Sequence, residues 1–402
     1  MAEIREFPGN KEGKNHNFTA KILKHRLGTA IRILVAVALI VVVVIILRNQ
    51  YRDQRYTNIV VAESAPKESL AENSYIASAG NVVTYSKDGI SSANGSGKVL
   101  WNMTYEMQKP MVRENDGMVA VCDYNGHLIY VINSSGKESE IDTNLPIRDF
   151  ALSAEGRVAA IVEDAGNSWV NIYDSTGEKL VEIKATMTKT GYPMAVALSG
   201  EVMAVSYMYV DAENIRSSVT FYNFGGIGEN TADHIVSSYD YSDAVVPIID
   251  FLNKENVYAV SDNRLMFYAG EKKPVSTSDV MLSERIVGVI PGDIDVALIF
   301  YDISGEHKYR LDHYGENGKL TYSYAFDMDY KDIVLRGGQT MIYNENQCLI
   351  VGSDGQEKFN GFFEHQVIFV APTDSNHKYV AVTRDAIETL KIEYSDNLNI
   401  RK

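Results

Sequence analysis

The chain has 402 residues, a formal net charge of −15 and two cysteines. Residues 1–47 hold seven Lys or Arg and three Asp or Glu, so the rest of the chain carries about −19. A surface this acidic repels polyanions, which argues against a nucleic-acid partner. Cys122 and Cys348 are too few for a disulfide framework. We expect two buried free thiols, with a single disulfide as the alternative.

An uninterrupted apolar run, ILVAVALIVVVVIIL, lies between Arg32 and Arg48. A bilayer core needs roughly 20 helical residues, and the run reaches that length when it is extended back to Leu27. Arg32 then lies near one end, where its guanidinium can reach the headgroups. The sequence therefore predicts one transmembrane helix over residues 27–47. No small-residue cleavage site follows closely, which favours a retained signal anchor over a cleaved signal peptide.

Basic residues are unevenly distributed about this helix. Seven lie in it or upstream of it, whereas Arg48, Arg52 and Arg55 follow the run. Because basic residues stay preferentially on the cytoplasmic side, we expect residues 1–26 to form a cytoplasmic tail. The sequence thus predicts a single-pass protein of the cell membrane with a large extracytoplasmic C-terminal domain.

The residue composition of the chain changes twice beyond the helix. Residues 48–73 are polar and are predicted to form a linker, which contains a short apolar segment within residues 57–62. Over residues 74–394, short β-branched and aromatic runs alternate with Gly, Asn, Asp and Ser, which is typical of an all-β domain. Residues 395–402 are predicted to be a C-terminal tail.

The strands of this domain repeat. Each unit contains a pair of short strands joined by a turn, and the predicted second strands of these pairs end at positions spaced by about 43 residues, namely Ala93, Ile132, Tyr173, Tyr222, Tyr268, Tyr314, Val351 and Ile392. This period predicts a β-propeller of eight blades, with seven blades or separate β-sandwiches as alternatives. The last unit ends before an outer strand, so we expect residues 57–62 to pair there and close the ring.

One unit has a specific resemblance. Residues 89–101, GISSANGSGKVLW, are similar to the repeat of quinoprotein-type propellers, in which Gly97 and Lys98 stand in a turn and Trp101 packs between blades. Gly136 and Gly177 occupy the turn position in later units. The resemblance implies the propeller fold over residues 57–394.

Quinoprotein dehydrogenases bind a quinone and calcium and often carry an adjacent cysteine pair, which this chain lacks. Propellers of the BamB type share the fold and imply a binding scaffold instead. The combination of anchor, acidic tyrosine-rich propeller and basic tail also resembles an uncharacterised family of membrane-anchored propeller proteins from Gram-positive anaerobes. That family has no assigned activity, so this resemblance implies fold and location.

No motif of catalysis, cofactor binding or metal binding stands out, and we expect no catalytic residue, no cofactor and no metal. The aspartate clusters lack the glycine-containing spacing of calcium loops. Four tyrosines near predicted strand ends or long loops are candidates for partner contact, because tyrosine suits an amphipathic contact surface: Tyr207, Tyr209, Tyr239 and Tyr241. Packing between blades is the alternative role for these side chains.

The sequence favours a non-catalytic binding or assembly scaffold that holds a protein or a cell-envelope component near the membrane. The alternative is an envelope enzyme, acting on glycans or using a quinone, with its site in the central funnel of the propeller. A sensor that signals to the basic tail is a third hypothesis, which the shortness of the tail disfavours.

Overall fold

The computed structural model describes residues 16–52, 55–67, 73–185, 191–211, 214–373, 375 and 377–394. Contacts divide the chain into two units, Met1–Gln54 and Arg55–Lys402. Within the described residues, the first unit holds one long helix and the second holds the strands.

The helix α1 (His16–Arg52) contains both Arg32 and Arg48. Its segment His25–Val44 is long and apolar enough to cross a membrane, and the side chains of that segment are not buried in the protein. An apolar run without a polar stripe is typical of a helix that faces lipid on all sides. The helix starts before, and ends after, the predicted residues 27–47, and residues 1–15 of the predicted tail lie outside the described part.

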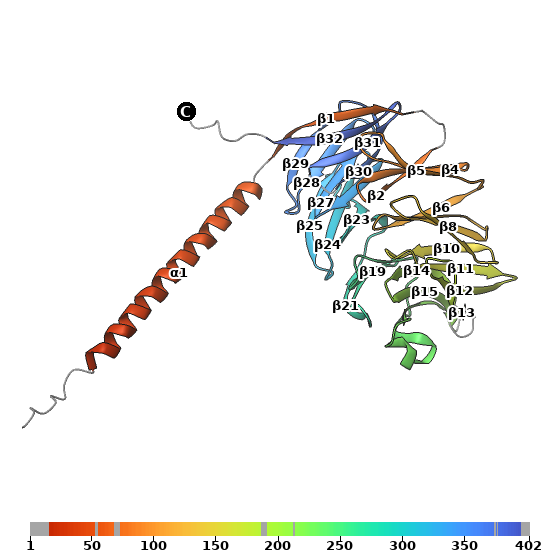
Figure 1. The fold of residues 1–402 in the computed structure, drawn as a ribbon, viewed down its shortest axis with the longest axis horizontal. Helices are drawn as coiled ribbons and strands as arrows, with labels where there is room; N and C mark the ends of the chain where they lie inside the picture. Colours follow the sequence, from red (N-terminus) through yellow and green to blue (C-terminus); the bar gives the residue numbers. More distant parts are fainter. Residues whose placement is uncertain are drawn as a thin grey trace, which may run out of the picture. The chain divides into compact units, whose positions relative to one another are not determined.

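The second unit is a propeller of eight four-stranded antiparallel sheets, as predicted (Figure 1). Blade 1 consists of β2 (Ser74–Ser78), β3 (Asn81–Tyr85), β4 (Gly89–Ala93) and β5 (Val99–Thr104). Blade 2 consists of β6 (Pro110–Asn115), β7 (Met118–Asp123), β8 (Leu128–Ile132) and β9 (Glu138–Asp142). Blade 3 consists of β10 (Ile147–Leu152), β11 (Val158–Asp164), β12 (Asn167–Tyr173) and β13 (Lys179–Ala185).

Blades 4 to 6 follow the same order. Blade 4 consists of β14 (Tyr192–Ser199), β15 (Val202–Asp211), β16 (Asn214–Asn223) and β17 (Ile235–Tyr241), with two short 3₁₀ helices, η1 (Gly228–Asn230) and η2 (Ala232–His234), before β17. Blade 5 consists of β18 (Ile248–Phe251), β19 (Asn256–Val260), β20 (Arg264–Ala269) and β21 (Val275–Met281). Blade 6 consists of β22 (Ile286–Pro291), β23 (Asp295–Tyr301), β24 (Tyr309–Gly315) and β25 (Leu320–Phe326).

Blade 7 consists of β26 (Asp332–Arg336), β27 (Gln339–Tyr343), β28 (Gln347–Val351) and β29 (Glu357–Phe362). Blade 8 is made from both ends of the domain: β30 (Val367–Pro372), β31 (Lys378–Thr383) and β32 (Ala386–Tyr394) are completed by β1 (Tyr56–Pro66). The strand β1 pairs antiparallel with β32, from Tyr56 opposite Tyr394 to Pro66 opposite Ala386. It is longer than the predicted segment 57–62, and it supplies the missing outer strand.

The core is divided among the blade interfaces. Eight clusters of buried apolar side chains each draw on two neighbouring blades. One of them joins blade 8 to blade 1 through Val82 and Val380, and another holds Ile59 of β1 between blades 7 and 8. A single blade cannot bury both faces of its sheet, so this shared packing is what stabilises the ring.

The two faces of the ring are formed by different loops. One face carries the connectors between blades and the turns between second and third strands, and we call it the upper face. The lower face carries the turns between first and second strands and between third and fourth strands. Because β1 begins at Tyr56, opposite the end of β32, the chain enters the propeller at the lower face.

Candidate functional site

A central channel of about 830 Å³ runs through the propeller. It is lined by the first strand of every blade, which are β2, β6, β10, β14, β18, β22, β26 and β30. Its charged lining among the described residues is Arg113, Glu114, Asp116, Asp149, Asp250, Asp293 and Asp332. Six carboxyl groups therefore face one cation in a confined space.

The channel carboxylates are held by local contacts. Arg113 of blade 2 donates to Asp149 Oδ1 of blade 3 at 2.7 Å and to the carbonyl of Phe150 at 3.2 Å. Asp149, Asp250 and Asp332, from blades 3, 5 and 7, each accept a hydrogen bond from the backbone N–H of the following residue, at 2.8–2.9 Å. These contacts fix the carboxylates in the channel wall.

Surrounding protein raises the pKa of several of these carboxyl groups. For Asp149, Asp250, Asp332 and Glu114 the main cause is desolvation, which disfavours the ionised form. At Asp250 the neighbouring Phe251 N–H and Arg113 oppose the rise in pKa, and the charge of Asp149 adds to it. Carboxyl groups of this kind in a cavity are candidates for proton transfer.

A second cavity, of about 540 Å³, opens on the upper face between blades 5 and 6. We call it the upper groove. Its apolar lining includes Val245, Val260 and Val289, and Asp262 and Arg285 supply charge. Pro247 and Ile248 line both this groove and the central channel, so the two cavities adjoin. A concave apolar site with a few polar groups is the usual form of a binding site.

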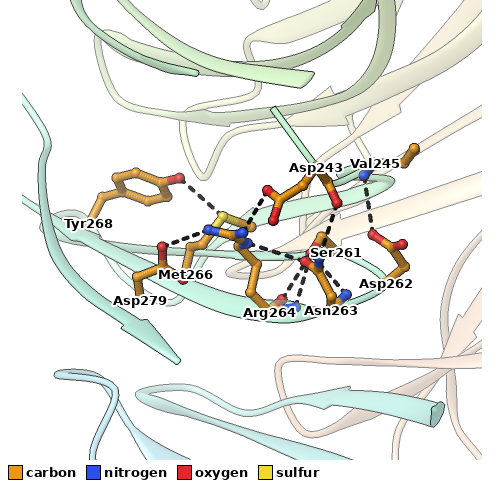
Figure 2. A network of polar contacts seen from close by, with 9 residues as sticks. All are labelled: Asp243, Val245, Ser261, Asp262, Asn263, Arg264, Met266, Tyr268 and Asp279. Carbon is orange, nitrogen blue, oxygen red and sulfur yellow. Dashed lines mark hydrogen bonds and ion pairs between the residues drawn. The ribbon is translucent and has the colours of Figure 1, made fainter. Parts of the chain in front are cut away.

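One wall of the upper groove is fixed by a polar network around Arg264 (Figure 2). The Arg264 side chain is 11% exposed and pairs with Asp243 at 2.7 Å and with Asp279 at 3.0 Å. It also lies over the ring of Tyr241, at 5.4 Å from the ring centroid. The guanidinium fork thus joins the connector between blades 4 and 5 to the strands β20 and β21, which a lysine could not do with the same geometry.

The same network reaches the groove lining directly. Asp262 accepts a hydrogen bond from the backbone N–H of Val245 at 3.2 Å. Asn263 donates to the carbonyl of Asp243 at 3.0 Å. Ser261 accepts from the backbone N–H of Arg264 at 3.0 Å. Val245, Ser261 and Asp262 all line the groove, so its wall is preorganised.

Exposed apolar side chains lie at the upper ends of strands in blades 5 and 6, the two blades that form the groove, and one of them, Val287, also lines it. Met281 ends β21, Val287 lies near the start of β22, Tyr301 ends β23 and Ile303 follows in the next turn, where it is 76% exposed. We call these four residues the upper apolar patch. Exposed apolar side chains beside a preformed groove are typical of a surface that contacts a partner.

The four candidate tyrosines lie mainly in the packing of blade 4 and of its interface with blade 5. Tyr207 is 1% exposed and its hydroxyl lies 2.9 Å from that of Tyr222. Tyr241 is 8% exposed and its hydroxyl lies 2.6 Å from that of Tyr268. Neither side chain offers a surface to a partner, so for these two residues the expected contact role is replaced by packing.

Tyr239 and Tyr209 differ from the buried pair. The ring of Tyr239 contacts that of Tyr268 at 5.2 Å, and its hydroxyl accepts from the backbone N–H of Ser276 in blade 5. Tyr209 is partly exposed and donates to Asp240 at 3.4 Å. The chain after Tyr207 forms an extended hairpin, because β15 and β16 pair as far as Asp211 opposite Asn214.

The repeat residues form the turns between third and fourth strands on the lower face. Gly97, Gly136 and Gly177 all have positive φ. A Cβ added at Gly136 would lie 2.6 Å from Cβ of Trp101, which stands on the outer strand of the preceding blade. The Lys98 side chain is exposed, and its backbone N–H donates to Asn94 Oδ1 at 3.0 Å.

Within the described residues no group of three or more His, Cys, Asp or Glu could hold a metal ion. Cys122 and Cys348 are both buried and free, and burial raises the pKa of each thiol. One buried polar pair joins His313 to Asp295 at 3.0 Å, with the ring of Tyr322 stacked on His313.

The groove and the channel charges are the site features that sequence reasoning missed. The pair Asp-Phe recurs on the first strands of blades 3 and 5, as Asp149-Phe150 and Asp250-Phe251, and this repetition could have indicated channel carboxylates. The partners of Arg264 are brought together by the ring, and no local pattern marks them.

No curated protein matches the chain. Among solved structures, two of AztD from Citrobacter koseri are similar in fold, each with a TM-score of 0.51. They are 11% and 10% identical to this chain, and cover 74% and 78% of it and 87% and 90% of their own lengths. BamB from Moraxella catarrhalis has a TM-score of 0.46 at 12% identity, over 86% of this chain and 100% of its own. Residues 52–392 match the model of DUF5711, a family of unknown function, and the chain belongs to that family.

Proposed function

We propose that this chain is a membrane-anchored binding protein, which holds a protein or an envelope component on the upper face of an extracytoplasmic propeller and carries out no catalysis. The anchor would be the segment His25–Val44, which has the length and composition of a membrane span. The orientation is supported by the excess of basic residues on its N-terminal side.

The observation that carries the binding role is the upper groove with the upper apolar patch beside it. Burying Val287 and Ile303 against a partner would remove apolar surface from water, which is the main driving force of association. Asp262 and Arg285 at the groove would select for a partner with complementary polar groups. Because the Arg264 network already orders the wall, little conformational entropy would be lost on binding.

An envelope enzyme is the second candidate. Its support is the group of channel carboxyls whose pKa is raised by desolvation, which is the environment that tunes a carboxyl for proton transfer. If isolated protein hydrolysed an envelope glycan and Asp250→Asn abolished that activity, the enzyme would replace the binding protein as the proposed function.

The binding role is tested by a charge placed in the patch. Val287→Asp in the full-length protein should abolish co-purification of the partner from crosslinked, detergent-solubilised membranes, because a carboxylate opposes apolar burial. The matched control is Ile227→Asp, which places the same charge at an exposed position on the lower face of blade 4. Equal recovery of partners with both variants would overturn the assignment of the groove.

A further inference from the structure

The lower rim of the propeller repeats one combination of side chains. Four outer strands begin with an exposed aliphatic residue at their first or second position, and an exposed lysine lies one or two positions before it. The aliphatic residues are Val99, Leu180, Val275 and Leu320, on blades 1, 3, 5 and 6, and their lysines are Lys98, Lys179, Lys273 and Lys319. We call these eight residues the lower rim.

The lower rim lies on the face at which the chain enters the propeller. β1 starts there at Tyr56, and residues 53–55 separate it from the end of α1 at Arg52. Since a residue spans at most about 3.6 Å, Tyr56 can be no more than about 14 Å along the chain from the end of that helix. The eight helical residues from Val44 to Arg52 add about 12 Å. If His25–Val44 spans the bilayer, the face that contains Tyr56 is therefore held within about 26 Å of the end of that span, a tether short enough for the face to reach the headgroups.

We propose that the lower rim contacts the lipid surface, with its four aliphatic side chains at the boundary between headgroups and acyl chains. A long lysine stem beside each aliphatic residue can lie along apolar surface while its ammonium group stays with the headgroup phosphates. This inference rests on the membrane anchor of the proposed function. It adds an orientation, in which the upper groove is turned away from the membrane.

The charges of the rim indicate which interaction dominates. The turns that hold the rim lysines also hold Lys272 and four carboxylates, and Lys179 pairs with Glu182, so the net charge there is small. The four carboxylates are Asp174, Glu178, Glu271 and Glu316. Attraction to anionic lipid is accordingly weak, and insertion of the aliphatic side chains provides the binding. The contact should therefore form on zwitterionic phosphatidylcholine as well as on anionic lipid.

The experiment measures the depth of single labels in the full-length protein reconstituted in phosphatidylcholine vesicles. Leu180→Cys and Leu320→Cys place an environment-sensitive fluorophore on the rim. Phe362→Cys is the matched control, because Phe362 is 65% exposed at the opposite, upper end of the outer strand of blade 7. Cys122 and Cys348 are buried and should stay unlabelled in the folded protein.

We expect headgroup-level nitroxide lipids to quench the two rim labels several-fold more strongly than the control. An alkaline wash first establishes that the protein stays in the vesicles. If it stays, equal quenching at all three positions, or no quenching at the rim, overturns the inference. Release by that washing overturns the anchor, and with it this inference. If the rim labels become shielded in detergent as the protein concentration rises, a second copy of the chain covers the rim instead of lipid.

Discussion

Gly136 and Trp101 meet across the interface between blades 2 and 1. Gly136 has φ +80° in the turn between β8 and β9, and a Cβ built on it would lie 2.6 Å from Cβ of Trp101 on β5. Equivalent turns of other blades approach the preceding outer strand in the same way: Gly97 meets Ala65, Gly177 meets the carbonyl of Glu140, Gly318 meets Ser278 and Gly355 meets Tyr322. In these five blades a glycine turn thus packs against the preceding blade, and for Gly97 the contacted strand is β1.

Gly136→Ala should lower the free energy of unfolding by about 1–3 kcal/mol, because it adds both a clash and an unfavourable φ. Gly166→Ala is the matched control, since Gly166 has the same φ of +80° with nothing within 4 Å of an added Cβ. Denaturant unfolding of both variants separates the clash from the backbone strain. Equal destabilisation would show that the contact with Trp101 contributes nothing.

Ile59 joins the N-terminal strand to the core between blades 7 and 8 and is fully buried. Ile59→Ala should destabilise the propeller by about 2–5 kcal/mol, the usual loss for a large aliphatic side chain removed from a core. Glu63→Ala on the same strand is exposed and should leave unfolding unchanged. An Ile59→Ala protein as stable as Glu63→Ala would mean that β1 is dispensable for closing the ring.

Asp250→Asn should stabilise the protein at pH 7, raising the melting temperature by about 1–3 °C. Desolvation raises the pKa of Asp250 in the folded state, so its ionised form opposes folding above that pKa. As the pH falls, the folded state binds the proton before the unfolded state does, and the penalty disappears. The melting temperatures of wild type and variant should therefore converge as the pH falls. A difference that grows on acidification would show that folding lowers the pKa of Asp250 instead of raising it.

Arg264→Gln should lower the free energy of unfolding by about 1–3 kcal/mol, because Asp243 and Asp279 lose the donor that they share. Lys308→Gln is the control, because Lys308 and Asp329 form an exposed pair of little net value. Chemical denaturation measures the free energy of unfolding of both variants. If they behaved alike, the network would be a surface feature without a role in ordering the groove wall.

The repeat period was predictable because local sequence patterns, an apolar run followed by a turn, mark each unit. Tyr173 ends β12, and Tyr222 and Tyr268 lie one residue before the ends of β16 and β20. All three follow short apolar runs and precede turns, so their spacing indicated the eight blades without knowledge of contacts. The spare segment before the first blade and the incomplete last unit similarly pointed to β1 and β32. The expectation of a family without an assigned activity agrees with the match to DUF5711.

The candidate site was less accessible from the sequence. Tyr207 was expected at a loop, but β15 continues beyond it to Asp211, which leaves its side chain inside the blade interface. The upper groove combines Val245, Val260 and Val289, which adjoin because of the ring and not because of sequence spacing. Residues 158–162 of β11 are all buried, so no alternation of polar and apolar residues indicates which blade interface each side chain enters.

Site-specific photocrosslinking in intact cells tests the central claim, that the upper groove binds a partner, most directly. A photoreactive amino acid at Val287 should give a discrete protein adduct, mapped by mass spectrometry to residues beside the groove, whereas the same group at Ile227 on the lower face should give no protein adduct. Adducts at Ile227 with none at Val287, or identical adducts at both positions, would contradict a binding site on the upper face.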